Sequence, residues 1–488
     1  MDRPNILLIT TDTQRVDTVA ALGNPHAISP NLDRLAAEGV VFEEAYTSSP
    51  VCSPARTSLL TGLHAPVHGV IENGYAMNGT FTPFSDLLAA AGYTNIMVGK
   101  THFGPTPASF HKQVIVKGKK AGTGDDPYAA ALRAAGYEKA SGHPNPIPEE
   151  LFEPAFVVDA TIDAIRRTLD RGAGPFFAWC SILCPHPPLD PPGRWAHAYD
   201  GVPLPPLHYR PGEVRSHPRH LLDLLGLDGP EPPAFDENEE PRYEYIDGVR
   251  RLYYGLAAYC DDQIGRLIRF LDEAGLRRNT LVLFTSDHGT ELFNHGFENK
   301  HNYYDATWRV PLIASMPGTL PEGARRSFAV LTDVTATILA AAGVDAPFVQ
   351  GVDLLGVQGR GRAALPEAPR RSAAGTLYRS CALATKRWKL EYYFEERRGR
   401  LFDRERDPME LDDLWDDPDA RGVRDELFGA LLAWRAELAD VENGHRTQGK
   451  GGPVARRVSR LAAKVRGSDA ERRLDEAVAR IEAKFDGK

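Results

Sequence analysis

Strand-like and helix-like segments alternate along the first 345 or so residues, and this alternation limits the possible folds more than any other feature of the chain. Residues 5–12, NILLITTD, are an apolar run that ends in polar residues, which is typical of a strand buried in a parallel sheet. Residues 29–39 have the pattern of a short helix with Ser29 as its N-cap. Further helix–strand pairs are predicted at 84–99, 156–182 and 243–289. The sequence therefore predicts an α/β fold, with helices flanking a mostly parallel central sheet and sites at the carboxyl ends of its strands.

The pattern changes near residue 373, and we expect three parts: a catalytic α/β domain at 1–372, a small α+β domain at 373–445 and an amphipathic helical tail at 446–488. The small domain has the pattern of several short strands with a turn at Gly399, followed by a helix. Two long segments, 104–150 and 185–242, interrupt the earlier alternation and are predicted to be loops. Such loops are either pocket walls or surface insertions.

The tail carries two apolar stripes at helical spacing, Val454, Val458, Leu461 and Val465, then Leu474, Val478, Ile481 and Phe485. Ser468 and Glu471 have the spacing of a capping box between the two helices. Residues 453–488 hold ten Lys or Arg and six Asp or Glu, and this mixture of signs favours a helical hairpin at a subunit interface over membrane contact. The tail therefore predicts a homo-oligomer.

Composition narrows the class of protein. The 488 residues can bury a large core, and a net charge of -9 argues against a general nucleic-acid binder. The first residues lack a signal-peptide layout, and no apolar run is long enough to span a bilayer. The five cysteines have no regular spacing, which argues against a disulfide framework: Cys52, Cys180, Cys184, Cys260 and Cys381. We therefore expect a cytoplasmic enzyme.

One cysteine stands at a predicted helix start, in the stretch AYTSSPVCSPARTSLLTG (45–62). Pro54 suits the first helical turn and Gly62 the helix end. A group at Cys52 then faces free N–H groups and the positive end of the helix dipole, which favours an anion. Arg56, one turn later, can point back at the same group. Cys52 is either a reactive group or a cysteine simply packed at a helix start.

Acidic residues end two of the predicted strands. Asp12 follows the first strand, and Asp287 and His288 follow the strand TLVLFTS. The ends of parallel strands converge, and two carboxylates with an imidazole suit a divalent cation. Acids at strand ends are also common helix caps, so the combination with Cys52 is what predicts a metal site.

Basic residues also follow probable strands. Lys100 and His102 alternate in GKTHFG and can face one side, and His186 follows the strand PFFAWCSI. The loop after Asp287 adds His295, Lys300, His301 and Arg309. A pocket lined by such cations, together with a metal, is suited to a substrate anion held at several oxygens.

These motifs together resemble the sulfatase family, within the alkaline-phosphatase-like superfamily. The resemblance covers residues 4 to 420 and rests on CSPAR (52–56), NILLITTD, GYTNIMVGKTHFG, PHPP, SDHG, GFENKHNYYDATWRVPLI and LFDRERDPMELDDL. In that family the cysteine is oxidised to formylglycine by a separate enzyme that reads the CSPAR pentapeptide. The resemblance therefore implies hydrolysis of a small anionic sulfate ester, with a formylglycine-generating enzyme as partner.

The resemblance also implies roles for individual residues. Asp12, Asp287 and His288 hold one divalent metal together with residue 52, whose hydrated aldehyde attacks the sulfur. In such an enzyme, Arg56 and Lys100 would stabilise the nucleophile and the sulfuryl oxygens. His102 would deprotonate the second hydroxyl to release sulfate. His186 and Lys300 would bind the ester and help protonate the leaving alcohol.

One position departs from the family pattern. Many members have two adjacent acids after the first strand, but here Asp12 is followed by Thr13, so one metal ligand is either lost or replaced by Thr13 or Gln14. The site loses one negative charge, and the His288 imidazole admits a softer ion. We expect calcium, with manganese or magnesium as alternatives.

Rival functions remain open at this level. The nearest is a phosphonate monoester or phosphodiester hydrolase on the same scaffold, a branch in which tyrosine and threonine match Lys100 and His102. The others are a phosphatase-like enzyme that uses unmodified Cys52 and a binding protein for a sulfated ligand. The alcohol that the enzyme releases is undetermined, because its pocket is expected in the two long loops.

Overall fold

The computed structural model describes residues 3–77, 81–117, 126–172, 174–219, 221–222, 234–236, 238–357, 363, 365–366, 370–438 and 466–485. Its centre is an eight-stranded sheet in the order β4-β3-β5-β1-β6-β7-β2-β8. The strands in that order are β4 (Lys112–Ile115), β3 (Thr94–Gly99), β5 (Phe176–Ser181), β1 (Asn5–Thr11), β6 (Thr280–Ser286), β7 (Leu312–Ser315), β2 (Gly39–Tyr46) and β8 (Ala324–Val330). β7 runs antiparallel to β6 and β2, and the other pairs are parallel. The predicted mostly parallel sheet is confirmed.

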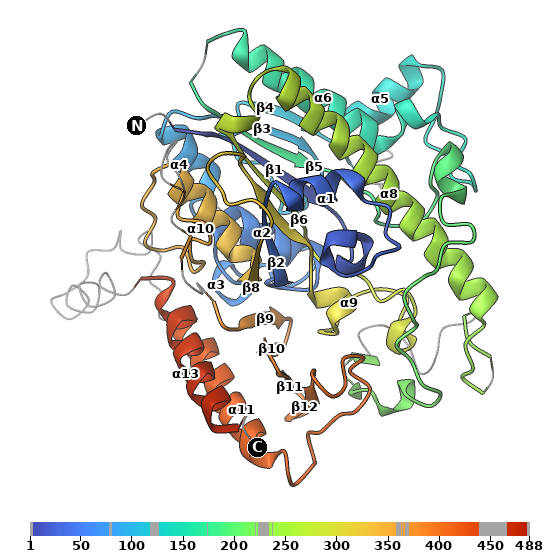
Figure 1. Ribbon diagram of the computed structural model, residues 1–488, viewed down its shortest axis with the longest axis vertical. Helices are drawn as coiled ribbons and strands as arrows, with labels where there is room; N and C mark the ends of the chain where they lie inside the picture. Colours follow the sequence, from blue (N-terminus) through green and yellow to red (C-terminus); the bar gives the residue numbers. More distant parts are fainter. Residues whose placement is uncertain are drawn as a thin grey trace, which may run out of the picture.

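Helices cover both faces of this sheet (Figure 1). One face packs on α1 (Pro30–Ala37), α6 (Glu153–Leu169) and α8 (Tyr243–Glu273), and the other on α2 (Cys52–Thr61), α4 (Phe84–Ala90) and α10 (Leu331–Ala341). Because side chains alternate along a strand, β1 supplies Leu7 and Ile9 to the first cluster and Ile6 and Leu8 to the second. The apolar run at 5–12 is therefore buried on both faces, as predicted.

Shorter helices connect these layers. The α-helices are α3 (Ala65–His68), α5 (Pro127–Ala134) and α9 (Asp305–Trp308), and the 3₁₀ turns are η1 (Val16–Thr18), η2 (Ala20–Leu22), η3 (Glu149–Leu151), η4 (Gly193–His197), η5 (Val214–Ser216), η6 (Arg277–Asn279) and η7 (Asn294–Gly296). The segment 104–150, predicted to be a loop, thus contains the edge strand β4 and the helix α5. Among the described residues, no helix combines the length and the low polarity that crossing a membrane requires.

A second, antiparallel sheet forms the small C-terminal α+β part. It consists of β9 (Ala373–Leu377), β10 (Ser380–Ala384), β11 (Trp388–Tyr393) and β12 (Arg398–Asp403), with α11 (Arg421–Glu437) and α13 (Asp469–Phe485) packed on it. The turn predicted at Gly399 is wrong, because Gly399 pairs with Tyr392 inside the β11–β12 ladder. A Cβ at this glycine would lie 2.3 Å from the Trp415 ring, so close packing explains the glycine.

The described part of the tail, α13, packs against α11 of the same chain (Figure 1). Leu474, Val478 and Ile481 are buried in the core of the small domain, so this stripe does not face a second subunit. The predicted capping box is also not formed, since Glu471 binds His64, Trp434 and Arg370 instead. The stripe Val454, Val458, Leu461 and Val465 lies outside the described residues. Oligomerisation stays a prediction.

Candidate active site

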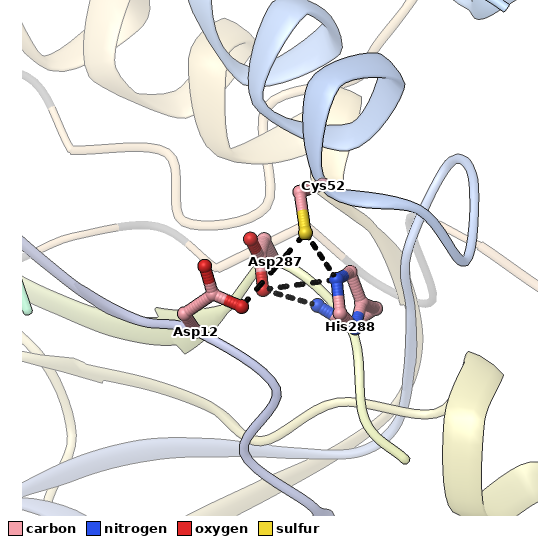
Figure 2. Close-up of side chains that lie close together, drawn as sticks. All are labelled: Asp12, Cys52, Asp287 and His288. Atoms are coloured by element: carbon pink, nitrogen blue, oxygen red, sulfur yellow. Dashed lines mark hydrogen bonds and ion pairs between the residues drawn. The ribbon is translucent and has the colours of Figure 1, made fainter. Parts of the chain in front are cut away.

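Two parallel strands bring the predicted metal ligands together. β1 and β6 pair in register up to Thr11 and Ser286, so Asp12 and the Asp287-His288 pair leave the sheet side by side. Cys52 is the first residue of α2 and projects toward all three side chains (Figure 2). Each of the four side chains is at most 1% exposed. The sequence had placed these residues together, and the structure does so.

The four side chains form a cluster that fits a cation. One ligand atom from each of Asp12, Cys52, Asp287 and His288 lies within 4.8 Å of the others. Cys52 Sγ lies 3.1 Å from His288 Nε2 and 3.9 Å from Asp12 Oδ1. His288 Nδ1 is 2.8 Å from the Gly289 carbonyl, so it donates there and leaves Nε2 as a lone-pair ligand. Two carboxylates and an oriented imidazole are a donor set that suits a divalent ion.

Three cations surround this cluster. Lys300 Nζ donates to Cys52 Sγ at 3.0 Å, and Lys100 forms an ion pair with Asp12. Arg56 Nε donates to Asp287 Oδ2 at 2.7 Å. The Arg56 guanidinium is fully buried and also donates to Ser181 Oγ at 2.8 Å, which fixes its plane. The predicted cationic anion pocket is therefore built around residue 52.

Local backbone geometry explains how Lys100 reaches the cluster. Gly99 ends β3 with φ +100°, a conformation that L side chains rarely adopt. A Cβ there would lie 1.8 Å from the Ser181 carbonyl oxygen, and that oxygen accepts a hydrogen bond from the Lys100 amide. The glycine in GKTHFG thus lets the chain turn at the strand end and bring the ammonium to Asp12.

Electrostatics sets Cys52 apart from the other cysteines. Burial raises the pKa of Cys180 to about 12. Burial and Asp12 also act to raise the pKa of Cys52, but Lys100, Lys300 and His288 outweigh them and hold it well below its ordinary value. Burial likewise acts to raise the pKa of Asp12, and the cations led by Lys100 lower it well below the usual range. The surrounding cations therefore stabilise a negative charge on both Cys52 and Asp12.

His186 lies at the edge of the same site. Its Nδ1 is 2.8 Å from the Pro187 carbonyl, so Nδ1 donates and Nε2 is free for a substrate. Burial, with a further contribution from Lys300 and Lys100, lowers the pKa of His186 despite the nearby Asp12 carboxylate. The imidazole is therefore neutral near pH 7.

The other predicted bases do not all join the cluster. His295 bonds to Glu213 at 2.6 Å and stacks on Tyr304. Arg309 donates to the Glu43 carbonyl, away from residue 52. His301 lies 3.5 Å from Glu72. The His102 side chain is exposed, and among the described residues no hydrogen bond or ion pair connects it to the cluster.

Both candidates lie beside the cluster at the position that departs from the family pattern. Thr13 Oγ1 donates to Asp12 Oδ1 at 2.6 Å, and its backbone N–H donates to Asp287 Oδ1 at 3.1 Å. The Gln14 amide nitrogen donates to Thr18 at 2.9 Å, and its Oε1 is buried without a partner among the described residues. Replacement of the ligand by Thr13 or by Gln14 stays a prediction.

Sequence reasoning missed one supporting residue, Ser181, which orients Arg56 by accepting its hydrogen bond at 2.8 Å. Ser181 could have been found, because the predicted strand PFFAWCSI contains it, and it is the last residue of β5. Asn73, which the sequence assigns to neither enzyme branch, accepts a hydrogen bond from the Ser53 amide at 3.0 Å, next to the nucleophile.

The fold and this site define a hydrolase with an alkaline-phosphatase-like architecture and a metal-binding donor set. A family model described as Sulfatase matches residues 4–344, so the chain belongs to the sulfatase family. A second family model, described as N-sulphoglucosamine sulphohydrolase, C-terminal, matches residues 293–437. The predicted class, a sulfuric ester hydrolase, is thereby confirmed.

Curated relatives match along nearly the whole chain. An arylsulfatase from Clostridium perfringens is 29% identical over 93% of this chain and 98% of its own length. The multifunctional alkaline phosphatase superfamily protein PehA from Trinickia caryophylli is 27% identical over 90% of this chain and 96% of its own.

Solved structures confirm the fold class. A phosphonate monoester hydrolase of Agrobacterium radiobacter has a TM-score of 0.76 at 24% identity, covering 89% of this chain and 96% of that one. A protein solved with its substrate D-glucosamine-2-N,6-O-disulfate has a TM-score of 0.72 at 21% identity, covering 92% and 100%.

Proposed function

We propose that this chain hydrolyses sulfate monoesters through a formylglycine made from Cys52 by a separate formylglycine-generating enzyme. The observation that carries the proposal is the position of Cys52, buried at the first residue of α2 and bonded by Lys300 and His288. A cysteine that only packs in the core needs no neighbouring cations. Cys180 is an example, because burial raises its pKa. The sequence CSPAR supplies the pentapeptide that the maturation enzyme reads.

The residues around position 52 stabilise charge on the sulfate group. Hydrated formylglycine supplies one hydroxyl that attacks sulfur and a second whose deprotonation releases sulfate. Lys300 and Lys100 place two ammonium groups beside residue 52, where the sulfuryl oxygens must lie. Arg56 is held by Asp287 and Ser181, so it is oriented before the substrate binds.

The leaving alcohol needs a proton, and two residues flank its expected position. Lys300 is the proton source, because its ammonium lies beside residue 52 and because Asp12 and Asp287 act to raise its pKa although burial acts to lower it. His186 is neutral with its proton on Nδ1, so its Nε2 can only accept a hydrogen bond, from the hydroxyl of the departing alcohol once that group is protonated. His102, on the Lys100 segment, stays the proposed base for sulfate release.

A divalent cation belongs to this proposal. Asp12, Asp287, His288 and residue 52 would hold it, and we propose calcium, with manganese or magnesium as alternatives. A bound cation supplies Lewis-acid activation of the nucleophile and charge stabilisation. Thr13 lowers the negative charge of the site relative to a second carboxylate, which weakens the preference for calcium.

We also propose a cytoplasmic location and a homo-oligomer. The five free cysteines support a reducing compartment. The C-terminal helices were the basis for the oligomer, and the burial of the α13 stripe within one chain removes part of that support.

The test is activity with and without maturation. Protein co-expressed with a formylglycine-generating enzyme should hydrolyse 4-nitrophenyl sulfate, and protein made without that enzyme should not. The alternative, a phosphonate monoester hydrolase, is measured on the same preparation with a phenylphosphonate ester. We expect a higher kcat/KM for the sulfate, and the double variant Lys100→Tyr, His102→Thr should move the ratio toward the phosphonate. A wild-type preference for the phosphonate of about tenfold or more contradicts the sulfatase proposal.

A further inference from the structure

A cavity of about 90 Å³ lies next to His186 and plays no part in the mechanism described so far. Both long segments that were predicted as pocket walls contribute to it. Tyr128 from α5 and Glu153 from α6 line one side, while His186 and Asp190 line another. Figure 1 shows α5 and α6 at the same end of the molecule, and the Tyr128 ring packs 5.4 Å from that of Phe156 on α6.

Two buried side chains that line this cavity each have one polar atom without a partner in the described structure. Glu153 is 5% exposed, and its Oε1 accepts the Leu183 amide at 3.1 Å while Oε2 is unpaired. Tyr128 is also 5% exposed, and its hydroxyl is unpaired. A buried polar atom without a partner is destabilising, so a ligand that pairs with both atoms would remove this cost.

The charges around the cavity disfavour a strongly ionic ligand. Lys139 forms an ion pair with Asp126, and Asp190 accepts a hydrogen bond from Asn145 at 2.9 Å. Burial raises the pKa of Glu153 to about 7, although the Leu183 and Cys184 amides and the Lys139 ammonium act to lower it. Lys117, which is exposed, and His186 also line the cavity, and the apolar part of the wall includes Val116, Ile147 and Phe152.

We propose that this cavity receives a small amide-bearing substituent of the alcohol part of the sulfate ester. The amide N–H donates to Glu153 Oε2, and its carbonyl accepts from the Tyr128 hydroxyl. An acetamido group has four heavy atoms and fits, whereas benzene occupies a cavity of about 150 Å³. This inference rests on the proposed sulfatase function, because His186 borders both the cavity and the anion site and so places the leaving alcohol at the entrance.

The first experiment compares two esters of the same shape. 2-Acetamidoethyl sulfate carries the amide, and 4-methylpentyl sulfate replaces it with a hydrocarbon of equal size. The matured enzyme should have a kcat/KM ratio of at least tenfold in favour of the amide. Equal values for the two esters overturn the proposal.

Glu153→Gln tests the acceptor. The single amide oxygen of glutamine is taken by the Leu183 N–H, so its NH₂ group faces the cavity and cannot accept a hydrogen bond. The ratio between the two esters should fall to near one, and Tyr128→Phe should lower it by a smaller factor. An unchanged ratio in both variants contradicts the assignment.

Ala140→Leu tests the site without touching a buried polar group, in case Glu153→Gln fails to fold. Ala140 is exposed and lines the rim of the cavity, so leucine there should lower the ratio by obstruction. Ala130→Leu on α5 is the control, since Ala130 is exposed and outside the cavity lining, and it should keep the wild-type ratio.

A binding measurement separates failure of this inference from failure of the proposed function. If matured protein hydrolyses no sulfate ester, the proposed function fails, and the cavity is then tested with 2-acetamidoethanol by saturation-transfer NMR. Binding that Glu153→Gln abolishes supports the cavity assignment. Absence of binding shows that the cavity holds water only and overturns it.

Discussion

At the scale of single residues, the site depends on charge placed around one cysteine. The ammonium of Lys300 contacts Cys52 Sγ, and the ammonium of Lys100 pairs with Asp12. The pKa of Cys52 is therefore low, although burial alone raises that of Cys180. The same charges that favour a thiolate also favour the anionic sulfate group in the proposed reaction.

The modification of Cys52 gives the first prediction. Tryptic peptides from protein co-expressed with a formylglycine-generating enzyme should contain residue 52 at a mass lower by about 18 Da, because the thiol has become an aldehyde. Cys52→Ser should stop after one turnover with a sulfated serine, since a simple alcohol has no second hydroxyl to release sulfate. Mass spectrometry measures both the mass of the peptide that contains residue 52 and the sulfation of the serine variant. Full activity from unmodified peptide rules the proposal out.

The metal gives the second prediction. Asp287→Asn should lower the bound divalent ion and the activity together, because it removes a charged ligand that also holds Arg56. Elemental analysis measures the ion, and add-back of calcium, manganese or magnesium to stripped protein identifies it by the activity restored.

The control for this variant is Asp261→Asn, another buried aspartate, which binds the Leu32 amide at 2.8 Å outside the cluster. The Asp261→Asn variant should keep the bound divalent ion. If Asp287→Asn also retains a stoichiometric ion, a different set of ligands is responsible.

At the scale of elements, the buried side chain of Glu471 helps to anchor the C-terminal helix α13 to the catalytic domain. Glu471 is fully buried and accepts hydrogen bonds from Trp434 and His64, and it pairs with Arg370. His64 follows α2, the helix that begins at Cys52. Deleting residues 453–488 removes these contacts, so we expect the deletion to lower folding stability.

Glu471→Gln gives the third prediction. Burial acts to raise the pKa of Glu471, but Arg370 and His64 lower it to about 2. A lowered pKa stabilises the fold above the unfolded pKa of about 4.3, and this contribution is lost as the pH falls toward 2. The variant should lose roughly 3 kcal/mol at pH 7, because it leaves a buried arginine less well paired.

Urea unfolding measures this difference at several pH values, and the gap between wild type and variant should narrow below about pH 4.3. Glu476→Gln on the same helix is the control. Glu476 is exposed and pairs only with Arg472 among the described residues, so its replacement should cost no more than about 1 kcal/mol. A gap that is constant from pH 7 to pH 3.5 contradicts the assigned role.

At the scale of the whole molecule, buried ion pairs join the small sheet to the catalytic domain. Lys389 of β11 is fully buried and donates to the Tyr303 carbonyl at 2.9 Å and to Asp305 at 2.6 Å. It also pairs with Glu410. Tyr303 follows Lys300 by three residues, so the small domain supports the loop that reaches the nucleophile.

Lys389→Met gives the fourth prediction. Removing the ammonium leaves buried carboxylates less compensated, and the unfolding free energy should fall by roughly 3 kcal/mol. Because these contacts cross between the sheets, calorimetry of the wild type should show one transition. The exposed Lys386→Met is the control and should change stability by less than about 0.5 kcal/mol. Two separate wild-type transitions contradict this coupling.

The sequence by itself determined the local helices and strands and identified the residues that carry reactive or metal-binding groups. The apolar run at β1 and the helix from Cys52 to Gly62 were predicted because periodicity, proline and glycine act over a few residues. The convergence of Asp12 with Asp287 followed from the rule that parallel strand ends share one edge.

Only the tertiary structure decided which of these residues meet. His295 and Arg309 lie in the same segment as Lys300, yet they face Glu213 and Glu43 instead of residue 52. Glu471 has the spacing of a capping group, but a buried arginine from elsewhere in the chain binds it more strongly than its own helix end does. These pairings join residues 82 to 266 positions apart, and their energies depend on burial, which no local pattern encodes.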